Sequence, residues 1–228
     1  MESSPLPFDI MLVTPDPGPA LDQGSVRGIC LLARAALDGG VRAVQLRAKS
    51  APAGQLLEVA EELREICDRA GGVLLINDRL DVALAAGAAG VQLGESGLPV
   101  EAAAGLIRRV GGVAGNRMMI GASVHSPQGV RERLASGADF VVFGNIFATP
   151  SKPGPAGRGL AALEEAVQAA AGRPVVAIGG ITAQNAAAVR LAGAAGAAVI
   201  GAIAGAADPR AAARELLAGW HGWRKLGR

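Results

Sequence analysis

The feature that most constrains the fold is a repeated unit, in which a short apolar run is followed by a small-residue loop and an alanine-rich stretch. Eight such runs occur, at residues 9–13, 41–46, 73–76, 89–93, 118–120, 140–143, 175–178 and 198–200. Their apolar residues are continuous rather than alternating, which is typical of strands buried on both faces of a parallel sheet. The intervening stretches, such as 53–70 and 160–171, carry their charges at helical spacing.

Eight strand–helix units predict an α/β protein, a single (β/α)8 TIM barrel. No composition break interrupts the 228 residues, so we expect one domain with its core at about 9–215 and a last helix at about 209–225. The helix between the third and fourth runs must be short, at roughly 79–86. A doubly wound open sheet is the runner-up, but such sheets usually have fewer strands, and no GxGxxG motif follows the first run.

Composition narrows the class of protein further. Half of the residues are hydrophobic and only 3% are aromatic, which supplies an aliphatic core and excludes a disordered chain. Twenty-two basic and 20 acidic side chains leave a formal charge of +2, which does not favour a nucleic-acid or membrane surface. The two cysteines, Cys30 and Cys67, form no CxxC pair and are predicted to be buried free thiols in a reducing compartment.

The start of the chain shows no targeting pattern. The first ten residues lack the basic and apolar regions of a signal peptide. The longest uncharged apolar stretch, 191–207, is short for a membrane span and contains four glycines. We therefore expect a cytoplasmic protein.

Polar residues occur where the apolar runs stop, and in a (β/α)8 barrel these strand ends build the active site. The candidates are Gln45, Arg47, Lys49, Asn77, Asp78, Gln92, Glu95, Ser123, His125, Asn145, Thr149 and Lys152. Gly179-Gly180 and Gly201-Ala202 close the seventh and eighth runs, where barrels often hold a phosphate on backbone N–H groups. The alternative for these glycines is an ordinary turn.

The charged candidates each have two interpretations. Arg47 and Lys49 stand two residues apart, so both can point into the barrel mouth and, with Lys152, form a cationic patch. They can also be ordinary surface charges. His125 is suited to move a proton near neutral pH, or it is a capping or packing residue.

Asn77-Asp78 could begin a Mg²⁺ site with Glu95 as a second carboxylate, because Mg²⁺ prefers oxygen ligands. Asp78 can equally cap the short helix that follows it, and we favour that cap slightly.

Taken together, segments 45–49, 76–94, 120–126, 143–159 and 177–182 resemble the thiamine-phosphate synthase and thiazole tautomerase superfamily. The resemblance covers about residues 10–210 and implies a (β/α)8 barrel that is a homo-oligomer. The synthase branch joins an aminopyrimidine diphosphate to a thiazole phosphate and releases pyrophosphate, using Mg²⁺. The tautomerase branch moves a proton on a non-aromatic thiazole carboxylate phosphate to give the aromatic isomer, without a metal.

The resemblance to the synthase branch assigns roles to several residues. It implies that Gln45, Arg47 and Lys49 hold the diphosphate and that Asn77 and Asp78 form the pyrimidine and metal segment. It also implies that Ser123 is the fifth-strand serine and that Thr149 and Lys152 belong to an anion-binding loop. The chain departs from this pattern at Gly97, where the synthases have an aspartate that ligates Mg²⁺, and at Gln92, where a histidine is usual. Loss of one of two carboxylates should cripple a site that must neutralise a diphosphate leaving group.

The resemblance to the tautomerase branch rests on 123–126, on Gln92-Leu93, and on 143–147 followed by 157–159. It implies that His125 transfers the proton. We therefore predict a thiazole tautomerase, an isomerase that uses no metal or other cofactor. The predicted phosphate site is Gly179, Gly180, Gly201 and Ala202, with the substrate carboxylate near Arg47, Thr149 or Lys152 and with Asn145 also binding substrate.

Two alternatives remain to this prediction. One is the Mg²⁺-dependent synthase, with Asp78 and Glu95 at the metal. The other is a non-catalytic barrel that binds a phosphorylated ligand or has a regulatory role. The predicted partner is a small phosphorylated thiazole, with no nucleic acid or membrane.

Overall fold

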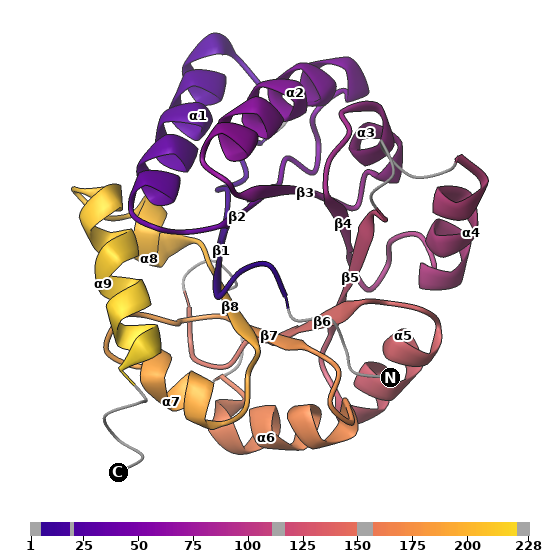
Figure 1. Cartoon of the computed structure of the whole chain (residues 1–228), viewed down its shortest axis with the longest axis vertical. Coiled ribbons are helices and arrows are strands. Elements are labelled where there is room, and N and C mark those ends of the chain that lie inside the picture. Colours follow the sequence, from indigo (N-terminus) through magenta and orange to yellow (C-terminus); the bar gives the residue numbers. More distant parts are fainter. Residues whose placement is uncertain (1–5, 19–20, 111–116, 150–156, 223–228) are drawn as a thin grey trace.

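The computed structural model describes residues 6–18, 21–110, 117–149 and 157–222. Eight parallel strands follow one another around a closed barrel, in which β8 pairs with β1 (Figure 1). The strands are β1 Ile10–Val13, β2 Ala43–Leu46, β3 Val73–Asn77, β4 Gly90–Leu93, β5 Met119–Val124, β6 Phe140–Gly144, β7 Val175–Ile178 and β8 Gly196–Val199. The predicted (β/α)8 barrel is confirmed.

A ring of helices surrounds the strands (Figure 1). The helices are α1 Gln23–Asp38, α2 Ala53–Arg69, α3 Leu80–Ala85, α4 Val100–Val110, α5 Pro127–Ala135, α6 Gly159–Ala169, α7 Ala186–Leu191, α8 Gly201–Ala204 and α9 Pro209–His221. Local chemistry sets several helix starts, since Asp22, Ser126 and Asp208 each accept a backbone N–H of the first turn. The short helix expected between the third and fourth strands is α3.

Two strands differ from the apolar runs that predicted them. The run at 118–120 is only the beginning of β5, which continues because Gly121 pairs with Phe140 and Val124 with Phe143. The run at 198–200 overlaps only the end of β8, which begins at Gly196 opposite Val176 and ends at Val199. Small residues that pair through their backbones give no hydrophobic signal, so the runs mark these strands incompletely.

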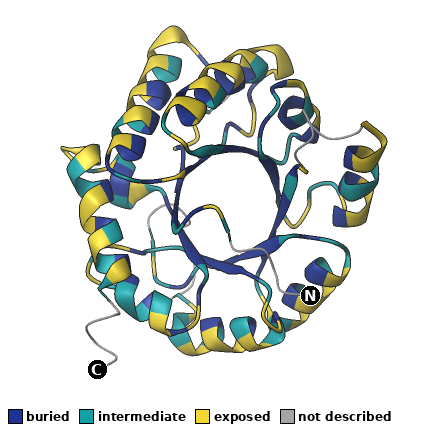
Figure 2. Ribbon diagram, in the orientation of Figure 1, coloured by how far each residue is buried: buried dark blue, intermediate teal, exposed yellow. Residues whose placement is uncertain are grey.

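Two apolar layers hold the barrel together, and Figure 2 shows the strand ring buried between them. The outer layer lies between strands and helices. The inner layer fills the barrel with Met11, Val13, Leu75, Phe140 and neighbouring side chains. Phe8, which precedes β1, packs into this interior, with its ring centroid 6.1 Å from that of Phe140. The interior is therefore packed at this level rather than open.

Helix α9 completes the outer ring by packing against α1 and α7. Its Trp220 is fully buried, and the Arg190 guanidinium carbon lies 5.5 Å from the centroid of the indole ring. Cys30 and Cys67 are buried free thiols, as the sequence predicted. In the described part of the chain, no helix has the length and apolar character needed to span a bilayer.

Candidate active site

A layer of polar side chains lies directly above the apolar interior. In β2, Ala43 faces the interior, so Gln45, two residues later, faces the same way. The same alternation turns three more side chains inward at the C-terminal ends of their strands. We call this set the polar layer: Gln45, Asn77, Gln92 and Ser123. Four strands therefore place amide and hydroxyl groups at the floor of the barrel mouth.

Hydrogen bonds tie the polar layer together across neighbouring strands. The Gln45 Nε2 group donates to Asn77 Oδ1 at 3.0 Å, and the Gln92 Nε2 group donates to Ser123 Oγ at 3.3 Å. Gln45 and Gln92 are buried. Such side chains present fixed donors and acceptors, which suits recognition of a heteroaromatic ring.

Asp78 turns its carboxylate over the end of β4. Its φ of 59° is in the left-handed region, which aspartate tolerates better than most residues. Its Oδ1 accepts the Gly94 N–H at 2.6 Å, and its Oδ2 accepts the Asn77 Nδ2 group at 2.9 Å. The predicted helix cap is wrong, because Arg79 is the residue at the N-terminus of α3 and no side chain caps that helix.

The donors around Asp78 define which metal could bind there. Residue 97 is glycine and supplies no second carboxylate. A Cβ atom added there would lie only 2.7 Å from Asp78 Oδ1. Among the residues that the structure describes, no three His, Cys, Asp or Glu side chains gather as a metal site. One carboxylate still fits Mg²⁺ that is held mainly by substrate phosphates and water.

Glu95, considered above as a second metal ligand, lies beside His125 instead. Its Oε2 atom is 3.6 Å from His125 Nε2, and its backbone carbonyl accepts from Arg133 at 3.0 Å. The other ring nitrogen, Nδ1, lies 2.5 Å from the carbonyl oxygen of Gly144. A carbonyl oxygen only accepts, so Nδ1 carries the proton and Nε2 is the basic nitrogen of the neutral ring.

Arg47 extends from the end of β2 toward the loop that follows β1. Its backbone N–H donates to Thr14 Oγ1 at 2.9 Å, and its guanidinium is 3.3 Å from Asp16 Oδ2. Lys49 is exposed in the same loop after β2. Lys152, the third member of the predicted cationic patch, lies outside the described residues. The sequence analysis did not consider Thr14 and Asp16, although they follow the first apolar run as the other candidates follow theirs.

The predicted phosphate site lies where the loop after β6 crosses the end of β7. Gly179 and Gly180 have positive φ angles of 104° and 65°. A Cβ atom on Gly179 would lie 2.5 Å from Asn145 Cβ, and one on Gly180 would lie 2.6 Å from the Ala148 oxygen. Packing of this loop is therefore reason enough for both glycines, and phosphate binding there stays a prediction.

The remaining predicted residues lie near this crossing. Gly201 and Ala202 open the four-residue helix α8, whose first N–H groups have no partner within the helix. Asn145 follows β6, and its backbone oxygen accepts the Arg158 N–H at 2.9 Å. Thr149 is the last described residue before the gap at 150–156. The structure thus places these residues at strand ends without assigning them a ligand.

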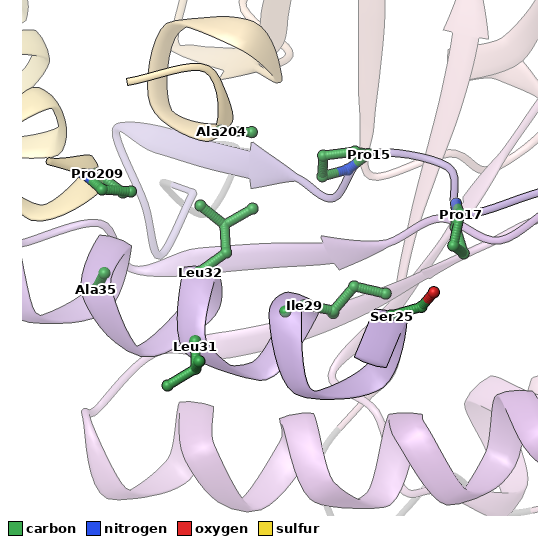
Figure 3. Close-up of a pocket in the computed structure, with 10 residues that line it drawn as sticks. Pro15, Pro17, Ser25, Ile29, Leu31, Leu32, Ala35, Ala204 and Pro209 are labelled. Atoms are coloured by element: carbon green, nitrogen blue, oxygen red, sulfur yellow. The ribbon is translucent and has the colours of Figure 1, made fainter. Parts of the chain in front are cut away.

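A surface pocket of about 550 Å³ lies elsewhere, between α1, the loop after β1 and the start of α9 (Figure 3). Its walls include Ile29, Leu31, Leu32 and Pro15, with Ser25 as a polar neighbour and no ionisable side chain. Such a lining offers no group for proton transfer or phosphate binding. We therefore place the candidate active site at the barrel mouth and not in this pocket.

Comparison with known proteins shows which family the barrel belongs to. A family model described as thiamine monophosphate synthase matches residues 20–203. The thiamine-phosphate synthase of Methanoculleus marisnigri is 50% identical over 187 residues, covering 81% of this chain and 84% of that protein. The thiamine-phosphate synthase of Anaeromyxobacter dehalogenans is 47% identical over 193 residues, covering 84% and 83%.

A solved structure is also similar to this chain. The thiamine phosphate pyrophosphorylase from Pyrococcus furiosus has a TM-score of 0.81 at 33% identity, covering 95% of this chain and 97% of that chain. These names give no support to our sequence-based placement nearer the tautomerase branch. The barrel is an enzyme of thiamine biosynthesis, and the chain belongs to the thiamine monophosphate synthase family.

Proposed function

We propose that this enzyme is a thiamine-phosphate synthase, which joins an aminopyrimidine diphosphate to a thiazole phosphate and releases pyrophosphate. The observation that carries the proposal is the convergence of Arg47, Asp78 and the polar layer on one barrel mouth. The synthase names of relatives that are 47–50% identical support the same reaction. The synthase therefore replaces the tautomerase as the leading function.

Each group at the mouth has a task in this reaction. The bond between the pyrimidine methylene carbon and its diphosphate oxygen breaks, and a bond to the thiazole nitrogen forms. Arg47 and Lys49 bind the diphosphate, because a guanidinium and an ammonium complement its charge. The amides of the polar layer orient the pyrimidine ring. Asp78 would hold Mg²⁺ together with the diphosphate, and when bound this ion neutralises charge on the leaving pyrophosphate.

The test is synthesis of thiamine phosphate by the purified protein, with MgCl2 and then with EDTA. We expect product and pyrophosphate only with Mg²⁺. Asp78→Asn removes the carboxylate that would hold Mg²⁺ and should lower kcat by about 10²-fold or more. Asp81→Asn is the matched control, because Asp81 pairs with Arg79 on the surface. Product formation in EDTA at the Mg²⁺ rate, or an unchanged Asp78→Asn variant, would overturn the proposal.

The second candidate is the thiazole tautomerase, favoured by the geometry of His125. Its Nδ1 donates to the Gly144 carbonyl, so Nε2 is the ring nitrogen that would take a proton from the thiazole and return it. Gly97 adds to this reading, since it removes a metal ligand that only the synthase would need. Here His125→Asn should lower metal-independent isomerisation by about 10²–10⁴-fold. A protein that binds thiazole phosphate yet converts neither substrate would be the non-catalytic barrel.

A further inference from the structure

Gln92 is the one buried side chain whose polar atom is left without a partner in the described part of the chain. Its Nε2 group donates to Ser123, but its Oε1 atom is buried and accepts no hydrogen bond. A buried acceptor without a donor destabilises a fold, so its presence calls for a reason. The fold alone gives none, because the inner layer below consists of apolar side chains.

Gly121 leaves space for the Gln92 amide. A Cβ atom on Gly121 would lie 2.1 Å from Gln92 Oε1 and 2.4 Å from Phe140 Cζ. Its φ lies outside the positive region, so the backbone does not require glycine here. The glycine instead leaves room for the Gln92 carboxamide beside the Phe140 ring. Two strands therefore accommodate a polar group that costs stability.

The consequence of the Gln92 contact appears at Ser123. An amide N–H only donates, so the Ser123 oxygen is the acceptor of this hydrogen bond. The hydroxyl proton must then point elsewhere, and it makes no hydrogen bond to a described residue. Ser123 is half-buried at the floor of the mouth, whereas Gln92 lies beneath the surface. The open direction for the proton is therefore the mouth.

We propose that Gln92 is a positioning residue, which holds the Ser123 hydroxyl as a hydrogen-bond donor toward an unprotonated ring nitrogen of the aminopyrimidine substrate. The inference rests on the proposed synthase function, since it names the group that Ser123 meets in that substrate. A pyrimidine ring nitrogen accepts and cannot donate, so a fixed hydroxyl donor complements it. Gln92 itself does not touch the substrate.

Three variants test this role. Gln92→Met keeps the unbranched length and removes both polar ends. We expect its melting temperature to be at least that of the wild type, because the unpaired acceptor is gone. KM for the aminopyrimidine diphosphate should rise about tenfold, the loss of one hydrogen bond, with a smaller change in kcat. Gln92→His restores an N–H donor and should return KM toward the wild type. Gln128→Met, on the exposed face of α5, is the matched control.

A double-mutant cycle with Ser123→Ala decides whether Gln92 acts through Ser123. The same cycle is measured as Kd for the aminopyrimidine diphosphate by calorimetry, which needs no turnover. We expect the double variant to bind no more weakly than Ser123→Ala alone. Independent effects that multiply would overturn the inference. The inference would also be overturned if Gln92→Met had a lower melting temperature, with KM raised and kcat lowered to a similar extent. If the wild type binds the diphosphate but makes no thiamine phosphate, the proposed synthase function is wrong. The double-mutant cycle measured as Kd still tests the role of Gln92 in that case.

Discussion

At the residue scale, Asp16 competes with an incoming diphosphate for the Arg47 guanidinium at the barrel mouth. The two side chains are about one quarter exposed, at 27% and 26%, and lie 3.3 Å apart. A diphosphate that binds Arg47 must share this guanidinium with the Asp16 carboxylate or displace it. Asp16 therefore orients the cation but also repels the incoming anion. In a partly solvated site both effects depend on ionic strength.

We predict that repulsion is the larger of the two effects. Asp16→Asn should tighten pyrophosphate binding by about three- to tenfold at low salt, because it removes a like charge near the anion. Arg47→Gln should weaken it by at least as much. Calorimetric titration with pyrophosphate at low and high salt measures both. The control is Asp68→Asn, since Asp68 pairs with Arg64 on the outer surface of α2. Weaker binding by Asp16→Asn at low salt would show that orientation dominates.

The same residues show how far the sequence leads at this scale. The rule that polar residues at strand ends build the site brought Gln45, Asn77 and Ser123 to one mouth. It did not reveal that Asp78 turns toward the Gly94 N–H, or that Asp16 meets Arg47. These contacts join loops that are distant in sequence. Their direction depends on backbone angles and strand register, which no local pattern records.

At the scale of the elements, the loop after β6 and the end of β7 form one packed unit. The Ile146 N–H donates to the Ile178 oxygen at 2.9 Å, and the Phe147 N–H donates to the Gly179 oxygen at 3.0 Å. Gly179 permits this approach because any side chain would strike Asn145. The loop carries Asn145 and leads to Thr149, so its packing positions part of the candidate site.

Gly179→Ala should therefore disrupt both stability and function. The matched control is Gly137→Ala, because Gly137 has nearly the same φ, 106° against 104°, but has open space around it. We expect Gly137→Ala to cost about 1–2 kcal/mol from the backbone alone. Gly179→Ala should cost about 1–3 kcal/mol more, from the contact with Asn145. Urea unfolding measures the difference, and only Gly179→Ala should also raise KM. Equal costs would show that the loop yields without strain.

Element boundaries divide into those that hydrophobic pattern fixes and those that it does not. Runs such as 73–76 and 175–178 nearly coincide with β3 and β7, whose residues are bulky and buried. In β5 and β8, Gly121 and Gly196 pair through the backbone where bulk would not fit. Pattern thus finds the number and order of the strands. Their ends follow from closure of the barrel.

At the scale of the whole molecule, closure leaves each strand hydrogen-bonded to two neighbours. A closed sheet has no edge from which a strand can peel, so helices and strands should open together. Cys30 in α1 and Cys67 in α2 are buried reporters of that opening. Burial raises the pKa of Cys30 to about 11 and that of Cys67 to about 12. Near neutral pH both thiols are therefore protonated and unreactive in the folded protein.

We predict that thiol reagents label these cysteines only on global unfolding. The free energy of opening from labelling should equal the free energy of unfolding from circular dichroism in urea. Variants Cys30→Ala and Cys67→Ala leave one thiol each, so each helix is followed separately. A much lower free energy of opening at either thiol would reveal that its helix detaches while the barrel persists.

The same burial makes the stability of the barrel fall in alkali. An unfolded thiol ionises around its ordinary pKa of 9.0, whereas Cys67 in the folded protein stays protonated to about pH 12. Between these values the unfolded state binds fewer protons, so the free energy of unfolding decreases as pH rises. Cys67→Ala removes this difference and should flatten the decline measured by urea unfolding from pH 9 upward. Cys30→Ala should act in the same direction over a narrower range, to about pH 11. An unchanged slope in Cys67→Ala would mean that this thiol becomes solvated before the barrel unfolds.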